Sequence, residues 1–342
     1  MLYRMLGFAA LTLGSALGAQ AQELTVRTFG GAFADAQQSA YFDPFAEESG
    51  AKVWVDTDLG GLATIKSAVI AGQVKWDVVM VDEDELTLGC AEGLFEPLDL
   101  KAMGGEDLLP EAVSPCGAGS LILATGIAYN TTDMGGGSPK SWADFWDLET
   151  WPGKRGMRNA PQMNLIAALL ADGVDVEDIT DVMRTPEGLD RAFAKMDEIK
   201  AEIQFWEAGA QPVEWLNSGN VVMSTAYNAR ISNAKEEGAP LEYVWHRNML
   251  TITAWAVPTG APNKDLGLEF IKFANQPEPQ ANFSKLFLYG PTNSKAFDFL
   301  DEARASQLPA GEKMTESFSL DQEFWSDNYD RILVRWTAWA AQ

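Results

Sequence analysis

The sequence Trp76–Asp84 (WDVVMVDED) joins a hydrophobic run to an acidic end. Its middle, Val78–Val81, is unbroken, apolar and largely β-branched, which is typical of a strand covered on both faces of a parallel sheet. The acids Asp82 to Glu85 follow directly. Because open α/β sheets bind ligands just beyond the carboxyl ends of their strands, these acids are placed to meet a cationic solute. Alternatively, they cap the helix predicted over Glu85–Gly93, since negative charge suits its first turn.

The chain before this strand predicts the opening of a doubly wound sheet. Strand patterns at Leu24–Phe29 and Ala51–Val55 alternate with two helical patterns before the Trp76 strand, which gives a β-α-β-α-β unit. The first strand runs into Gly30 and Gly31. Since glycine lets a backbone approach a ligand closely, we expect this pair to contact the solute through its main chain.

The first 21 residues predict a secretory signal peptide. They contain one arginine, the apolar segment Met5–Leu17 and the A-x-A sequence Ala19-Gln20-Ala21. The apolar segment is shorter than a membrane span requires. We therefore expect cleavage after Ala21 and export of the mature chain.

Composition favours a globular protein of two domains or lobes. The chain has 342 residues, of which 46% are hydrophobic, with 12 Trp and 17 Phe to build a core. Its formal net charge is −24, and loss of the single leader arginine makes the mature chain one unit more negative. Nucleic acid and anionic membrane surfaces are therefore poor partners.

The two cysteines, Cys90 and Cys116, predict a disulfide because the chain is exported. A redox or nucleophilic role is the alternative, but there is no C-x-x-C spacing and the only histidine, His246, is remote in sequence. One histidine without a second His or Cys cannot make a zinc site, and the acidic run lacks the spacing of a calcium loop. We expect no metal and no cofactor.

Two later segments predict strands that cross between lobes. Leu121–Tyr129 (LILATGIAY) and Thr251–Val257 (TITAWAV) have strand composition, and another strand is predicted at Leu241–His246. Two α/β halves joined by two such strands form a hinged binding protein with a cleft between the lobes. The predicted division assigns residues 22–126 and 254–298 to lobe 1, and residues 127–253 and 299–342 to lobe 2.

Short sequences spread over the mature chain carry a family resemblance. They include SWADFWDLE at 141–149, GKRGM at 153–157, STAYNARI at 224–231, AWAVPTGAPNKD at 254–265 and LYGPTNSKAF at 288–297. Their order and spacing resemble the spermidine/putrescine branch of the periplasmic solute-binding proteins of ABC importers. The resemblance implies an α/β, two-lobed periplasmic binding protein of type II (Venus-flytrap) with two crossing strands at its hinge. It further implies a monomer in the periplasm that hands one small solute to ABC permease subunits in the inner membrane.

The resemblance also implies how the solute is held. The polyamine binders place aromatic faces along the methylenes of the ligand and carboxylates at its ammonium ends. Tyr227 and Tyr289 fall on aromatic positions of that site, and Asn228 follows Tyr227 as a hydrogen-bonding residue. Trp206 and Trp255 are further candidates for the aromatic wall.

This chain departs from the family at several site positions. Gly30 and Phe33 replace a Trp and a Tyr, and Asp82 and Asp84 stand where the family tends to have Ser and Tyr. We expect the two aspartates to bind the ammonium of a polyamine such as putrescine or spermidine. Arg230 leaves an alternative open, because carboxylates in one lobe and an arginine in the other suit a zwitterion such as 4-aminobutyrate, or a choline-like quaternary amine. Arg230 could equally form a structural ion pair.

An enzyme is the alternative from another class of protein. The sequence has no G-x-S-x-G elbow, P-loop or G-x-G-x-x-G motif. Two carboxylates across a cleft would suit a glycosidase, and a flat face would suit an adhesion or scaffolding protein. The resemblance favours a binding protein that performs no chemistry.

Overall fold

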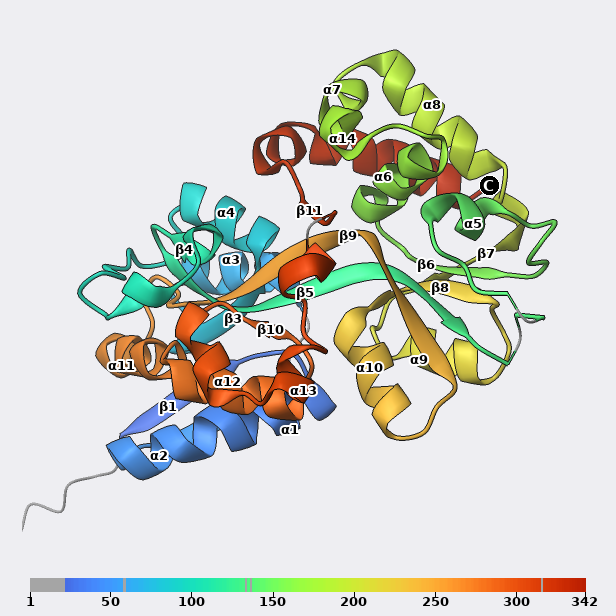
Figure 1. The fold of residues 1–342 in the computed structure, drawn as a ribbon. Helices are drawn as coiled ribbons and strands as arrows, with labels where there is room; N and C mark the ends of the chain where they lie inside the picture. Colours follow the sequence, from blue (N-terminus) through green and yellow to red (C-terminus); the bar gives the residue numbers. More distant parts are fainter. Residues whose placement is uncertain (1–21, 58–59, 133, 136, 315) are drawn as a thin grey trace, which may run out of the picture.

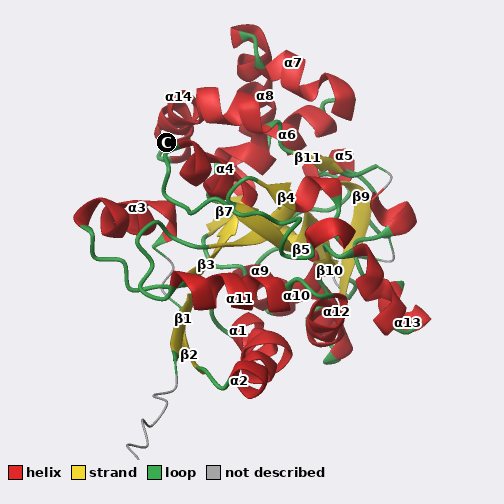
Figure 2. Ribbon diagram, turned by 90° about the vertical axis from the view of Figure 1, so that its left-hand side faces the viewer, coloured by secondary structure: helices red, strands yellow, loops and turns green. Residues whose placement is uncertain are grey.

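The computed structural model describes residues 22–57, 60–132, 134–135, 137–314 and 316–342. The predicted signal peptide lies outside these ranges. The described chain forms two α/β lobes, with one sheet running through both and helices packed on its two faces (Figures 1 and 2). The predicted fold class is therefore confirmed.

The strands vary from short edge segments to two long central strands. In chain order they are β1 (Glu23–Arg27), β2 (Lys52–Asp56), β3 (Val78–Asp82), β4 (Val113–Ser114), β5 (Gly117–Asn130), β6 (Arg155–Arg158), β7 (Ile203–Trp206), β8 (Met223–Tyr227), β9 (Leu241–Ala256), β10 (Gly290–Pro291) and β11 (Phe318–Ser319).

The sheet has parallel ends and an antiparallel centre. Its main strand order is β2-β1-β3-β9-β5-β8-β6-β7. In lobe 1, β1 pairs in parallel with β2 and β3, and in lobe 2, β6 pairs in parallel with β7 and β8. The central pairs β3·β9, β9·β5 and β5·β8 are antiparallel. Each lobe therefore presents the carboxyl ends of its own parallel strands to the space between the lobes.

Helices cover both faces of the sheet (Figure 2). They are α1 (Ala32–Gln37), α2 (Asp43–Ser49), α3 (Gly61–Ala71), α4 (Glu83–Ala91), α5 (Trp142–Trp146), α6 (Pro161–Ala171), α7 (Ile179–Met183), α8 (Pro186–Asp197), α9 (Gln211–Asn217), α10 (Asn228–Glu236), α11 (Lys264–Ala274), α12 (Pro277–Leu286), α13 (Glu302–Ala305) and α14 (Gln322–Ala340). A π-helical turn, Gln38–Phe42, joins α1 to α2.

The long strands β5 and β9 cross between the lobes (Figure 1). Their antiparallel pairing runs along most of both strands, so the segments predicted separately at Leu241–His246 and Thr251–Val257 belong to one continuous strand. The separate assignment was wrong. The pairing register shifts between Thr125 and Ile127, and Arg247 on the facing strand has a φ of 48°. This bulge lets β9 bend without ending, which a search for strand breaks in the sequence does not anticipate.

Two large apolar clusters form the cores of the lobes. The first draws on residues 24–123 and 252–308 and includes Ala229 of α10, and the second draws mainly on residues 127–249 together with α14. The predicted lobe boundaries stay a prediction, but Leu308 packs in the first cluster. Core packing therefore keeps the chain with lobe 1 beyond the predicted boundary at residue 298.

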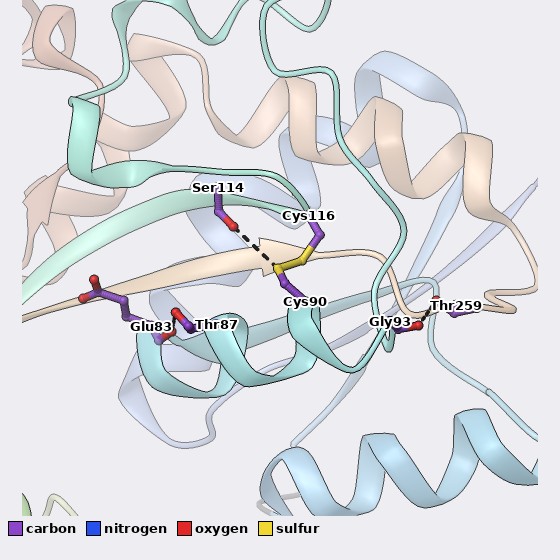
Figure 3. The surroundings of a disulfide bond; sticks show 7 residues. All are labelled: Glu83, Thr87, Cys90, Gly93, Ser114, Cys116 and Thr259. Atoms are coloured by element: carbon purple, nitrogen blue, oxygen red, sulfur yellow. Dashed lines mark hydrogen bonds between the residues drawn. A yellow bond between two sulfur atoms is a disulfide. The ribbon is translucent and has the colours of Figure 1, made fainter. Parts of the chain in front are cut away.

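Cys90 and Cys116 form the predicted disulfide, with their Cα atoms 5.9 Å apart (Figure 3). Cys90 lies in the last turn of α4, whose first turn carries the acids, and Cys116 directly precedes β5. The bond therefore ties the helix behind the acidic strand end to the start of a crossing strand. No helix in the described ranges is both long and apolar enough to cross a membrane.

Candidate ligand-binding site

A cavity of about 570 Å³ lies between the lobes; we call it the main cavity. Four strands end on residues of its lining, namely β1 on Arg27, β3 on Asp82, β6 on Arg158 and β8 on Tyr227. Because both lobes point the carboxyl ends of parallel strands at this space, side chains distant in sequence meet here. The predicted contacts in the lining are Gly30, Gly31, Asp82, Tyr227, Arg230 and Tyr289.

Three arginines of the main cavity lack a polar partner. The guanidinium groups of Arg27, Arg158 and Arg230 make no hydrogen bond or ion pair with other residues in the described ranges, whereas every other arginine there has one. Arg27 is only 4% exposed and stacks its charge over Trp76 at 5.5 Å. In a chain with 49 acidic residues, three unpaired guanidinium groups in one cavity indicate a receptor for an anionic group.

Asp82 supplies the opposite charge from lobe 1. It precedes α4 in an extended conformation, and its side chain makes no capping hydrogen bond, so the capping alternative fails for this residue. Burial raises the pKa of Asp82 to about 7, helped by the neighbouring Asp84 and Glu85 and opposed by Arg158. A carboxyl held in this way becomes fully charged when a cation comes to rest beside it.

The other acids of the strand end have different contacts. Glu85 accepts a hydrogen bond of 2.8 Å from the backbone N–H of Leu62 and so fixes the start of α3. Asp84 accepts a hydrogen bond from the N–H of Glu85 and lies outside the main cavity. It lines a second cavity of about 240 Å³, which shares Asp82, Glu85 and Arg158 with the main cavity; we call this second cavity the acidic chamber.

Aromatic rings form the apolar part of the main cavity. Tyr289 is 4% exposed and packs against Phe33, with ring centroids 6.1 Å apart. Burial raises the pKa of Tyr227, and the guanidinium groups of Arg158 and Arg230 oppose that rise. Burial also raises the pKa of Tyr289, so both hydroxyls remain neutral donors at physiological pH, in a cavity whose arginines favour an anionic group.

Trp206, a predicted wall residue, does not line the main cavity. It is fully buried as the last residue of β7, and its indole N–H donates to the Thr225 hydroxyl at 3.1 Å. Its ring meets Tyr227 edge to face, with centroids 5.6 Å apart. Trp206 therefore supports Tyr227 from behind.

Trp255 and Asn228 are also absent from the lining, which corrects two further expectations. Trp255 is fully buried in the lobe 1 core, where its ring packs edge to face on Phe270. Asn228 is fully buried as well; its side chain accepts from the N–H of Ala124 and donates to the carbonyl of Leu288, each at 2.9 Å. Both positions leave no face for a solute.

Arg27 and Arg158 were not among the predicted site residues. Arg158 had a usable signal, because it stands at the end of the strand-like sequence 154–158, just as Asp82 stands at the end of its strand. Arg27 lies inside a strand pattern, where an isolated arginine indicates a surface position. No group of three or more His, Cys, Asp or Glu residues within the described ranges is arranged to hold a metal ion.

Known proteins match most of the chain. The profile of the family described as bacterial extracellular solute-binding protein matches residues 40–310. The gamma-aminobutyric acid-binding protein of Pseudomonas aeruginosa is 43% identical, covering 99% of this chain and 97% of that protein. The spermidine/putrescine-binding periplasmic protein 1 of Haemophilus influenzae is 25% identical, covering 68% of this chain and 65% of that protein. A solved structure of a GABA receptor is 32% identical with a TM-score of 0.85, covering 94% of this chain and 98% of the other. The chain therefore belongs to the bacterial extracellular solute-binding protein family.

Proposed function

We propose that this protein captures a small zwitterion of the 4-aminobutyrate class between its lobes and delivers it to an ABC importer. In this proposal Asp82 binds the ammonium group. Arg230, with Arg158 and Arg27 beside it, binds the carboxylate. Tyr227 and Tyr289 enclose the methylene chain between the two charged ends.

The observation that carries the proposal is that one cavity contains positive and negative side chains that form no ion pair with each other. Arg27, Arg158 and Arg230 have no polar partner among the described residues, and all three line the main cavity together with Asp82. Arg27 is buried, Arg230 and Asp82 are partly buried, and Arg158 is exposed. A charge that is removed from water without a partner is costly, so each sign favours a ligand group of the opposite sign. An ω-amino acid supplies one of each.

The first expectation, a polyamine, is less well supported. Putrescine and spermidine carry ammonium groups at both ends, so binding would bring one of them near three guanidinium groups, none of which forms an ion pair with a described carboxylate, although Asp82, Glu85 and Glu207 line the same cavity. The relatives point the same way. The protein named for gamma-aminobutyric acid shares 43% identity over nearly the full length, against 25% over about two thirds for the polyamine binder.

Binding without chemistry suits this architecture. Asp82 belongs to lobe 1, whereas Arg158 and Arg230 belong to lobe 2, so a bound zwitterion would contact both lobes at once. Such a ligand favours the closed form because only that form satisfies both of its ends. The closed form in the periplasm is then the species that we expect to dock on the permease subunits.

Calorimetric titration of refolded, ligand-free protein tests the proposal. The panel is 4-aminobutyrate, putrescine, butylamine and butyrate, because the last two each lack one charged end. We expect 4-aminobutyrate to bind most tightly, with each truncated compound weaker by at least about tenfold. Tighter binding of putrescine than of 4-aminobutyrate would overturn the proposal and restore the polyamine reading.

A further inference from the structure

The acidic chamber is larger than a primary ammonium group needs. Its volume is about 240 Å³, whereas a cavity volume of roughly 10–15 Å³ is enough for one water molecule, which is similar in size to an ammonium group. Asp82, Glu85 and Arg158 line both this chamber and the main cavity, so the two cavities are adjacent. We therefore infer that a longer cationic end in the main cavity reaches the chamber beside Asp82.

The chamber has a strong excess of negative charge. Its walls contain the carboxylates of Asp82, Glu83, Asp84 and Glu85, against the single guanidinium of Arg158. Burial raises the pKa of Asp82, Glu83 and Glu85, and the carboxylate of Asp84 raises each further. A cation with several donors would relieve this repulsion more completely than one contact at Asp82.

The chamber also contains a hydroxyl group without a hydrogen-bond partner among the described residues. Thr125, from the crossing strand β5, lines the chamber at 3% exposure, and its hydroxyl has no hydrogen-bond partner in the described part of the chain. Tyr329, from α14 of lobe 2, adds an aromatic ring to the wall. The chamber thus combines acids, a free hydroxyl and a ring, contributed by both lobes.

We propose that the acidic chamber is a subsite for a guanidinium head group, so that the solutes of this protein include ω-guanidino acids such as 4-guanidinobutyrate. This inference rests on the proposed function, because the carboxylate end of such a solute occupies the main cavity in the same way as that of 4-aminobutyrate. The planar guanidinium presents five N–H donors in a fixed fork, which suits adjacent carboxylates and stacks on an aromatic ring. A quaternary ammonium fits the volume but offers no donor to the carboxylates or to Thr125.

Competition between two ligands tests the subsite. Calorimetry compares 4-guanidinobutyrate with 4-aminobutyrate on the wild-type protein and on Asp84→Asn, which removes a charge from the chamber at an exposed residue outside the main cavity. The matched control is Glu207→Gln, an exposed acid that lines only the main cavity. We expect 4-guanidinobutyrate to bind within about tenfold of 4-aminobutyrate on the wild type. Asp84→Asn should weaken the guanidino acid by about tenfold and the amino acid by less than about threefold.

The outcomes separate the two proposals. If 4-aminobutyrate binds and 4-guanidinobutyrate does not, the subsite is refuted while the proposed function stands. Equal losses of both ligands in Asp84→Asn, or a selective loss in Glu207→Gln, also refute the subsite. If neither compound binds, the proposed function falls and the subsite falls with it.

Discussion

Asp82 and Arg158 line the same cavity from strand ends of different lobes, and no ion pair joins them. Arg158 opposes the burial that raises the pKa of Asp82, while Tyr227 and, to a smaller extent, Asp82 raise the pKa of Arg158. Asp82 ends β3 and Arg158 ends β6, so the two charges are brought together by the fold and by no local sequence feature. A bound zwitterion can satisfy both groups, which makes this relationship the basis of several predictions.

Replacing Arg230 with lysine should show whether ligand binding needs the planar guanidinium group or only its positive charge. Arg230→Lys keeps a positive charge but loses the planar fork, and we expect it to weaken 4-aminobutyrate binding by about 1.5–3 kcal/mol with little change in melting temperature. Arg331→Lys serves as the control, because Arg331 is exposed on α14 and donates a hydrogen bond to the neighbouring Asn328. Wild-type affinity in Arg230→Lys would exclude Arg230 from the site.

Asp82→Asn should weaken ligand binding and stabilise the ligand-free protein. Loss of the charged contact should cost about 1.5–3 kcal/mol of binding. Because the folded state raises the pKa of Asp82 to about 7, ionisation of this residue opposes folding. Its penalty is absent below the unfolded pKa near 4, grows as the pH rises, and is complete above about pH 7.

Thermal unfolding at several pH values checks that second effect. After allowance for solvent screening at this partly exposed residue, the gain in stability of Asp82→Asn should be on the order of 1–2 kcal/mol at pH 8. It should vanish at pH 4, where the wild-type carboxyl is protonated in the folded state. A stabilisation of equal size at both pH values would mean that the effect is steric and not electrostatic.

The affinity for 4-aminobutyrate should increase from pH 5.5 to pH 8. The ligand-free carboxyl of Asp82 is largely protonated below about pH 7, and binding of an ammonium group expels that proton. The slope should approach about tenfold per pH unit in the acidic range. Calorimetry in buffers of different ionisation enthalpy detects the released proton, and Asp82→Asn should abolish both the release and the slope.

Trp255→Phe should lower stability while leaving the affinity for the ligand within about threefold of the wild type. Trp255 is fully buried against Phe270 in the core, so the smaller ring leaves a void that costs about 1–3 kcal/mol. Chemical denaturation and titration of the same preparation measure both quantities. A tenfold loss of affinity at unchanged stability would return Trp255 to the site.

Removal of the disulfide should destabilise the protein by about 3–4 kcal/mol in the chain-entropy description, because the bond closes a sequence separation of 26 residues. Cys90→Ser/Cys116→Ser is compared with the oxidised wild type by thermal unfolding. We expect the binding of 4-aminobutyrate to weaken much less than the stability, since neither cysteine lines the main cavity. Unchanged stability would contradict the expected contribution of the bond.

Much of the fold could be predicted because local patterns determine it. The run Val78–Val81 is buried as its apolar composition predicts, and the acids follow it at the carboxyl end of β3. The continuity of β9 could not be predicted, since a bulge carrying a left-handed Arg247 looks in sequence like the end of a strand. Pairing with β5, a long-range interaction, keeps the strand intact.

The site was harder to predict because composition does not reveal depth along a strand. Thr253 lines the main cavity, whereas Trp255, two residues further along the same face, lies roughly 7 Å deeper in the lobe and belongs to the core. A polar side chain is also no sure sign of a ligand contact, because the side chain of Asn228 forms its hydrogen bonds with backbone groups. Arg158 became recognisable only once the fold brought β6 opposite β3.

The three unpaired guanidinium groups sit inside a molecule whose formal charge is −24, and this contrast has a kinetic consequence. The electric field of the negatively charged protein accelerates the association of a dication. It orients a zwitterion with its ammonium group toward the protein, but it accelerates this neutral solute little. The on-rate for 4-aminobutyrate should therefore change little with ionic strength, whereas that for any dication should fall as salt is added. Selection between the two solutes therefore depends on their dissociation rates, because at low ionic strength the dication, which is the weaker ligand, associates faster.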